Sequence, residues 1–441
     1  MGPRTNPLLV AILAVAIWGS HTSAARPPAP ERDRAVRRLM REHLETNLMP
    51  WWLEHSPDEQ YGGFLLELDR YGRPREGDKM LVTQARQIWA FSRLWRAGYR
   101  DPRLHRAAAR GLQFLQDHFW DQQHGGWVMA TDREGRPTRT DKSTYAHAFV
   151  IYAGVEFSNA FDDPRGLEAA ERTFRMLEEH AADPEHAGYF GQFERDWSPP
   201  RWGGRSKSMN TQLHLLEALT ELYRATDKEI HARRLREILD ALLEHAYLPE
   251  HRVCLESFEA DWTPATGRWF RRRNHETSYG HNVEFAWLMQ EAAEALDLPR
   301  ERYREVGLAL VDRALESAWE PKTGALYSEG PLTGKADDHD VSWWMQAENL
   351  VALDWAWRTT GEERYLAALE LQAAWVTEQQ ADRIYGGWWD ELAPDGTVTE
   401  PRKAHVWHGA YHEVRGVLRV AEDVWGARPE TEEMAPASRA R

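Results

Sequence analysis

Four stretches of the sequence place polar or aromatic side chains three or four residues apart, which brings each pair to one face of a helix. These pairs are Asn210 with His214, His281 with Glu284, Trp344 with Glu348, and His408 with His412. An imidazole has a solution pKa near neutrality, so it can both abstract and return a proton. Histidines placed beside carboxylates therefore indicate acid–base chemistry.

Two other chemistries are compatible with parts of this set. His408 and His412 have the spacing of a helical zinc pair. Gly409 follows His408, however, so the catalytic glutamate of a zinc-protease helix is missing, and we predict no metal or other cofactor. Hydrolysis of a glycosidic bond needs two flanking carboxyl groups, for which Glu284 and Glu348 are candidates. The many histidines favour proton transfer on a sugar over glycosidic cleavage.

Composition and charge narrow the class of ligand. The chain has 441 residues, 22 of them tryptophan, and tryptophan faces often form stacking platforms for sugar rings. The 70 acidic and 55 basic residues give a formal net charge of -15, so we exclude nucleic acid as a partner. Cys254 is the only cysteine, which excludes an internal disulfide and a cysteine-rich metal site. We expect a small-molecule sugar substrate and a monomer or weak homodimer.

The elements that position these residues repeat six times along the chain. Each repeat contains a short segment that opens near a glycine, alternates apolar and polar residues and ends at a turn, which predicts a small β-hairpin. The six segments begin at Tyr61, His124, His186, His251, Thr323 and Tyr385, at intervals of about 60 to 70 residues.

Two helical stretches accompany each hairpin. Those before the hairpins have one charged face and are expected on the outside: 31–55, 102–119, 164–181, 228–248, 301–319 and 363–380. Those after the hairpins are more apolar and are expected on the inside: 83–98, 143–161, 210–226, 281–296, 342–361 and 407–426. This alternation predicts an all-α (α/α)6 barrel, a toroid with the hairpins on one rim and the first outer helix beside the last inner helix. The competing architecture is an open α-solenoid, whose repeats are usually shorter, about 30 to 45 residues, and lack the hairpin.

In such a barrel the first turns of the inner helices meet at one central cavity. Besides the pairs named above, these turns contribute Arg86, Tyr145, His147, Trp343 and Trp407. Arg86 is suited to bind an oxygen anion, or to support a structural network. Glu284 can fix the tautomer of the His281 ring. Since Trp343 and Trp344 are neighbours, we expect that only one of them faces inward and that the other is core.

The two ends of the chain differ from the barrel. Arg4, an apolar run over 8–18 and small residues up to position 25 form the pattern of a secretory signal peptide, too short to span a bilayer comfortably. We therefore predict a signal peptide over 1–25, a proline-rich linker over 26–34, the barrel over 35–426 and a flexible tail over 427–441. A secreted or periplasmic protein without a membrane span is expected.

Four motifs in order along the chain resemble those of the N-acylglucosamine 2-epimerase superfamily, and within it the cellobiose 2-epimerases most. They are SMNTQLHLLE over 208–217, SYGHNVE over 278–284, WWMQAE over 343–348 and WHGAYH over 407–412. The resemblance covers nearly everything from about residue 35 to 425. It implies an (α/α)6 barrel that epimerises or isomerises unphosphorylated sugars without metal or nucleotide.

The resemblance also implies roles for individual residues. His281 and His412 match a pair of general acid–base histidines, His214 a third histidine linked to ring opening, and Arg86 an arginine that stabilises the intermediate. Positions that match substrate contacts are Tyr145, Asn210, Glu284, Trp344, Glu348 and Trp407. The chain departs from the motifs at Gln212, where cellobiose 2-epimerases typically have histidine, and at His408, where lysine is common.

The chemistry that follows is the inversion of one carbon centre. The C2 hydrogen of an open-chain aldose is α to the C1 carbonyl, so its removal gives a cis-enediolate that two bases on opposite faces can reprotonate differently. We predict a 2-epimerase for the reducing-end glucose of cellobiose or a related β-1,4-linked disaccharide. The alternatives are a mannose 2-epimerase or mannose–fructose isomerase acting on free monosaccharides, and a non-catalytic or hydrolytic sugar-binding barrel.

Overall fold

The computed structural model describes residues 27–201, 205–265 and 275–422. The predicted signal peptide and C-terminal tail lie outside the described residues. The first helix, α2 (Ala29–His43), begins inside the stretch predicted as a linker, so that boundary is wrong. Pro30 stands in the first turn of α2, where the missing N–H of proline costs nothing, and the proline-rich stretch therefore opens a helix.

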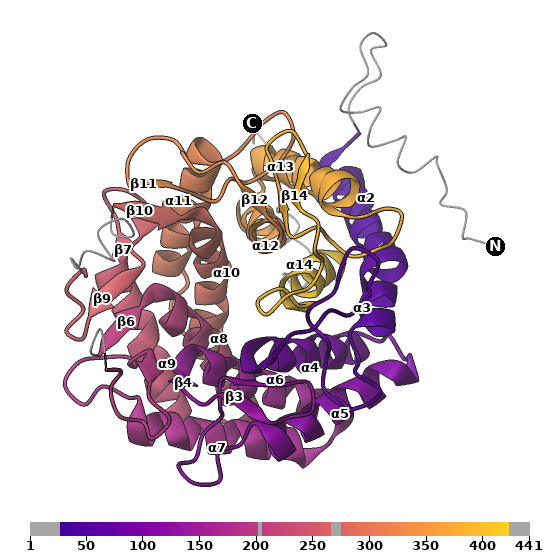
Figure 1. Cartoon of the computed structure of the whole chain (residues 1–441). Coiled ribbons are helices and arrows are strands. Elements are labelled where there is room, and N and C mark those ends of the chain that lie inside the picture. The colour runs from indigo at the N-terminus through magenta and orange to yellow at the C-terminus, as the bar shows by residue number, and fades with distance from the viewer. Residues whose placement is uncertain (1–26, 202–204, 266–274, 423–441) are drawn as a thin grey trace, which may run out of the picture.

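An outer ring of helices surrounds an inner ring, as the view down the barrel axis shows (Figure 1). Leu104, Ala108 and Leu115 of one outer helix share a buried face, whereas its other side is polar, as the sequence pattern predicts. Three of the outer helices continue into π-helical turns (η). The outer elements are α2 (Ala29–His43), η1 (Leu44–Leu48), α3 (Met49–His55), α5 (Pro102–His118), α7 (Pro164–His180), α9 (Glu229–Ala241), η2 (Leu242–Ala246), α11 (Glu301–Ser317), α13 (Glu363–Trp375) and η3 (Val376–Gln380).

The inner helices are buried on nearly all sides; in one of them, every residue from Ala146 to Phe157 is buried. They are α4 (Leu81–Arg96), α6 (Thr144–Phe161), α8 (Met209–Thr226), α10 (Tyr279–Ala295), α12 (Trp343–Thr360) and α14 (Tyr411–Glu422). Serine side chains accept hydrogen bonds from backbone N–H groups at the start of three of them: Ser143, Ser208 and Ser278. These caps determine where the first turns of α6, α8 and α10 begin, and with them the positions of the candidate site residues on these three helices.

The first and last elements of the chain close the ring. Arg37 of α2 donates to the backbone oxygen of Val420 in α14 at 2.6 Å. Arg32 of α2 also binds Glu370 of α13 at 2.7 Å, and α14 packs against α4 to complete the inner ring. The predicted (α/α)6 barrel is therefore confirmed, and the open solenoid is excluded.

Short strands on one rim link neighbouring repeats. Most pair the strand before an inner helix with the hairpin of the next repeat, as β1–β2, β4–β5, β6–β9, β10–β11 and β12–β13 do. A bridge between Leu68 and Ala404 joins the last repeat to the first. The predicted hairpins thus also connect successive repeats. The strands are β1 (Lys79–Met80), β2 (Ala130–Thr131), β3 (Pro137–Arg139), β4 (Lys142–Ser143), β5 (Gln192–Phe193), β6 (Ser206–Ser208), β7 (Tyr247–Leu248), β8 (Val253–Cys254), β9 (Ser257–Glu259), β10 (Glu276–Ser278), β11 (Glu329–Pro331), β12 (Val341–Ser342), β13 (Glu391–Leu392) and β14 (Val398–Glu400).

The fourth residue of an inner helix holds the hairpin beside it. Gln212 accepts from the backbone N–H of Tyr189 at 3.1 Å and donates to its carbonyl at 2.7 Å. His147 has the same place in α6, where its Nε2 accepts from Trp127 N–H at 3.0 Å. Gln84 and Gln346 do the same in α4 and α12. His147 is therefore a structural residue, and Gln212 occupies a position that binds the protein backbone.

Replacing His147 with alanine is expected to lower the free energy of unfolding by about 1–3 kcal/mol, because the buried Trp127 N–H loses its acceptor. His147→Gln is expected to be nearly neutral, since glutamine performs this role in three other repeats. Urea unfolding of both variants measures the difference. Equal destabilisation by the two substitutions would show that the imidazole itself is required.

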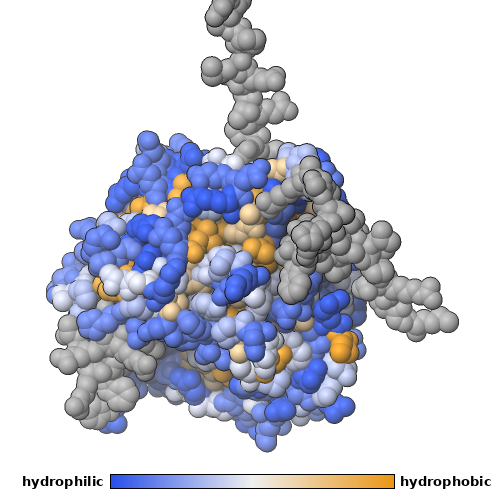
Figure 2. Space-filling view, turned by 90° about the horizontal axis from the view of Figure 1, so that it is seen from above, coloured by the Kyte–Doolittle hydropathy of each residue, from blue (hydrophilic) through white to orange (hydrophobic). Residues whose placement is uncertain are grey.

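One side of the barrel is mainly polar. The face in Figure 2 is covered largely by hydrophilic residues, with hydrophobic ones in small separate areas. Within the ranges that the structure describes, no helix combines the length and apolarity needed to cross a bilayer.

Candidate active site

A pocket of about 210 Å³ lies where the first turns of the inner helices converge. Of the residues predicted at the central cavity, all line this pocket except His147, His408 and Glu348, and Glu348 is fully buried behind His412. The lining residues are Arg86, Tyr145, Asn210, His214, His281, Glu284, Trp343, Trp344, Trp407 and His412. Residues from all six repeats thus meet in one pocket.

His281, in the first turn of α10, is oriented by Glu256, a residue that was not predicted from the sequence. Its Nδ1 donates to Glu256 Oε1 at 3.0 Å, which leaves Nε2 as the ring nitrogen available to the pocket. Burial opposes protonation of this ring, but the Glu256 carboxylate outweighs it and raises the pKa of His281. The expectation that Glu284 orients His281 is wrong. Glu256 lies between β8 and β9, so no helical spacing in the sequence connects it with His281.

His412 has the opposite electrostatic surroundings. Its Nδ1 donates to Glu348 Oε1 at 2.6 Å, and Arg415 donates to the same oxygen at 2.7 Å. Burial, together with the charges of Arg86 and Arg415, lowers the pKa of His412 well below its ordinary value. At neutral pH His412 is therefore a free base, whereas the surroundings of His281 favour its protonated form.

Trp344 brings these two histidines together. Its ring centroid lies 5.0 Å from that of His281 and 5.7 Å from that of His412. Both imidazoles therefore pack against the same indole at the pocket wall. Trp343 also lines the pocket while stacking on His408 at 4.1 Å. The expectation that only one of the two tryptophans faces inward is wrong, because Trp343 begins α12 at the rim.

His214 of α8 lies deeper in the same pocket. Its Nδ1 donates to Glu217 Oε2 at 3.0 Å, and its Nε2 is 4.0 Å from Glu284 Oε2. Burial lowers the pKa of His214 to about 4, so the ring is neutral at pH 7. It packs edge-on against Tyr145 at 5.2 Å between ring centroids.

Arg415 joins the carboxylates beneath these histidines. Its guanidinium group donates to Glu217, Glu284 and Glu348, and to the hydroxyl of Tyr411. Neither Arg415 nor Glu217 was identified from the sequence. Each follows a site histidine by three residues, at His412 and His214, and this helical spacing is a signal that points to both.

One cation for three buried carboxyl groups leaves them unequally charged. Burial would raise the pKa of Glu217, but the charge of Arg415 and the hydrogen bond from His214 lower it to about 2. Burial and the charge of Glu348 raise the pKa of Glu284 to about 8. Glu284 therefore holds a proton at neutral pH and Glu217 does not.

Arg86 and Asn210 present polar groups to the pocket. Arg86 donates to the Tyr145 hydroxyl at 2.7 Å and to the carbonyl of Trp407 at 3.2 Å, and its guanidinium lies 4.2 Å from the centroid of Phe149. Among the described residues the buried amide oxygen of Asn210 has no hydrogen-bond partner, so it is free to accept from a ligand hydroxyl.

Two groups of side chains each bring three possible metal-ligand atoms within 4.8 Å of one another. They are Glu284, Glu348 and His412, and Asp390, His405 and His408. In the first group Arg415 already donates to both Glu284 and Glu348 and supplies the positive charge there. The zinc pair considered for His408 and His412 does not form: His408 precedes α14 and binds Asp390, whereas His412 binds Glu348.

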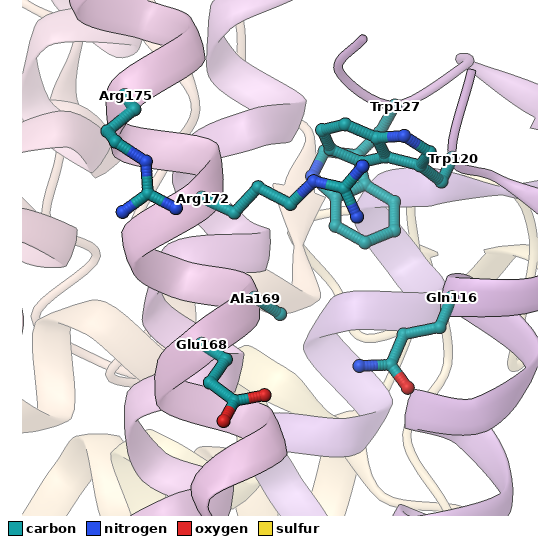
Figure 3. A pocket seen from close by; sticks show the side chains of 7 residues that line it. All are labelled: Gln116, Trp120, Trp127, Glu168, Ala169, Arg172 and Arg175. Atoms are coloured by element: carbon teal, nitrogen blue, oxygen red, sulfur yellow. The ribbon is translucent and has the colours of Figure 1, made fainter. Parts of the chain in front are cut away.

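A second hollow, of about 290 Å³, lies outside the ring between α5 and α7 (Figure 3). There the guanidinium group of Arg172 lies 3.2 Å from the centroid of the Trp120 ring. The protein's own cation thus covers the aromatic face that a sugar would need. Since no histidine lines this hollow, the central pocket is the candidate active site.

Known proteins resemble the chain over most of its length. A model of the family N-acylglucosamine 2-epimerase (GlcNAc 2-epimerase) matches residues 62–415. A cellobiose 2-epimerase of Bacteroides fragilis is 30% identical over 407 residues, which cover 87% of this chain and 98% of that protein. The structure of cellobiose 2-epimerase from Bacillus thermoamylovorans B4167 has a TM-score of 0.81 at 26% identity, covering 88% and 100% of the two chains. The crystal structure of a D-mannose isomerase has a TM-score of 0.78 at 21% identity, and the match covers 91% of this chain and 100% of that chain. This likeness concerns the fold alone.

The fold and the site define the class as an (α/α)6-barrel carbohydrate epimerase, an isomerase. More particularly, the chain belongs to the N-acylglucosamine 2-epimerase family.

Proposed function

We propose that the protein inverts C2 of the reducing-end glucose of cellobiose or a related β-1,4-linked disaccharide. The observation that carries this proposal is a pair of histidines, His281 and His412, which line one pocket beside Trp344 and favour opposite protonation states. The disaccharide is favoured because the curated relatives of 27 to 30% identity, such as that of Bacteroides fragilis, are cellobiose 2-epimerases.

The proposed reaction begins with the sugar in its open-chain form, and His214 assists ring opening. The neutral His412 removes the C2 proton; the electrons of the C2–H bond form a C1–C2 double bond, and those of the C1 carbonyl move to O1. Arg86, a permanent cation, stabilises this cis-enediolate, which is an electrostatic contribution that often dominates catalysis. After rotation about C2–C3, the protonated His281 returns a proton to the other face of C2, and the carbonyl reforms.

Incubation with cellobiose, and separately with mannose, in D2O tests the proposal. With cellobiose, proton NMR is expected to show the C2 proton signal disappear as deuterium replaces it. Signals of a mannose reducing end are expected to appear. Exchange on mannose alone, with fructose as product, would favour the monosaccharide isomerase. A C2 proton that does not exchange in either sugar would contradict the epimerase mechanism.

The pH profile reports the role of Glu256. Catalysis that needs neutral His412 and protonated His281 is lost at alkaline pH as His281 loses its proton. Glu256→Gln removes the carboxylate that raises the pKa of His281, so the alkaline limb of kcat/KM is expected to move to lower pH. Glu259→Gln is the matched control, because this exposed carboxylate on β9 makes no contact with His281. An alkaline limb unchanged in Glu256→Gln would remove His281 from the acid role.

We further propose that the protein is exported, on the support of the apolar run over 8–18 and the small residues before position 25. Mass spectrometry of the full chain expressed in a bacterial host is expected to find a mature N-terminus near residue 26 outside the cytoplasm. An uncleaved cytoplasmic protein would contradict export.

A further inference from the structure

Trp407 stands on a tight turn at the pocket and not on the inner helix predicted to carry it. α14 begins at Tyr411, and residues 405–408 form a turn in which His408 N–H donates to His405 O at 3.0 Å and His405 N–H to His408 O at 3.3 Å. Trp407 is 42% exposed and lines the pocket. Its backbone, and not a helix, therefore determines where its ring lies.

The side chain of His405 holds this backbone. Its Nδ1 accepts from the N–H of Trp407 at 3.2 Å, so its other nitrogen carries the proton. That Nε2–H donates to Asp390 Oδ1 at 2.8 Å. His408 Nδ1 donates to the same oxygen at 3.0 Å. Asp390 is itself anchored, because its carbonyl accepts from the N–H of Trp343, the first residue of α12.

The other backbone groups at the tip of the turn are also held. The carbonyl of Val406 accepts from the Thr83 hydroxyl at 3.1 Å, and the carbonyl of Trp407 accepts from Arg86 at 3.2 Å. Both partners lie on α4. The turn is therefore fixed on one side by α4. On the other side it is fixed by Asp390, which binds the His405 side chain of the turn.

A metal ion at Asp390, His405 and His408 is the competing interpretation of this group. A metal on His405 Nε2 would place the proton of the neutral ring on Nδ1, where it would face the N–H of Trp407. Two donors would then oppose each other, and the bond to Trp407 would be lost. The observed bonds therefore favour a proton-bearing network.

We propose that Asp390 and His405 are positioning residues that fix Trp407 at the pocket and thereby set the affinity for the sugar. The part that concerns sugar affinity rests on the proposed function. The part that concerns the backbone of Trp407 does not, and it is tested without substrate.

Amide hydrogen exchange tests the positioning of Trp407 directly. In His405→Phe the Trp407 N–H loses its acceptor, and its exchange is expected to accelerate about tenfold, read by residue-resolved mass spectrometry. In His405→Asn the rate is expected to stay near that of the wild type, because an asparagine side chain can accept from the N–H two residues on. Asp390→Ala is expected to accelerate exchange as His405→Phe does. Equal exchange in wild type and His405→Phe would overturn the proposal.

Kinetics on cellobiose test the consequence for the sugar. His405→Phe is expected to raise KM about three- to tenfold with kcat within about twofold, and His405→Asn is expected to restore KM. His339→Phe is the matched control: this exposed rim histidine contacts the carbonyl of Ala336 and the Tyr327 ring, and does not line the pocket. A loss confined to kcat, or a lower KM after addition of Zn²⁺, would overturn the positioning role. Failure of the wild type on cellobiose would contradict the proposed function and leave the exchange result to decide the positioning.

Discussion

Alanine at His281 or at His412 is expected to reduce C2 epimerisation about a thousandfold or more in each case. Each variant lacks one of the two groups that exchange a proton with C2, so neither can complete inversion. Both side chains line the pocket, and each gives up a single hydrogen bond from its ring, to Glu256 or to Glu348, so the fold is expected to persist. NMR of C2 deuteration measures the loss, and far-UV circular dichroism measures the fold.

His147→Gln is the matched control for this pair. His147 lies in the first turn of an inner helix but binds the rim hairpin, so its replacement by glutamine is expected to keep both fold and activity. A variant of His281 or His412 that keeps more than about a tenth of the wild-type rate would remove that residue from the acid–base pair.

Replacing Arg415 with methionine is expected to lower the free energy of unfolding by about 3–5 kcal/mol. The guanidinium group is fully buried and donates to Glu217, Glu284 and Glu348, so its removal leaves buried carboxylates without a cation. Urea unfolding measures the change. Catalytic activity is also expected to fall, because these carboxylates hold His214 and His412.

Two second-site substitutions make this prediction specific. Glu217→Gln in the Arg415→Met background is expected to recover more stability than Glu284→Gln, because the lowered pKa of Glu217 depends on the charge of Arg415, whereas burial and Glu348 already raise the pKa of Glu284 to about 8 with Arg415 present. Arg224→Met serves as the control on α8, where the partly exposed pair with Glu221 is expected to contribute at most about 1 kcal/mol. Equal losses from Arg415→Met and Arg224→Met would contradict the role of the buried cluster.

Periodicity in the chain was sufficient to predict the ring. Apolar spacing distinguishes outer helices such as α5, with one buried face, from inner helices such as α6, which is buried nearly all round. Once six such pairs alternate, the first turns of the inner helices must converge. The sequence alone therefore places Arg86, His214, His281 and His412 at one pocket. These features depend on neighbours within a few residues, which the sequence displays directly.

The partners of those residues depended on contacts between distant segments. Glu256 meets His281 from the segment between β8 and β9, 25 positions earlier, and Arg415 meets Glu217 across 198 positions. The last inner helix was predicted to start at residue 407, but α14 starts at Tyr411. The residues before it form a turn that is held by Asp390, through His405, and by α4. Local patterns thus predict which side chains face the cavity. Which of them carries a proton is decided by burial and by charges from other repeats, and only the folded ring brings those charges together.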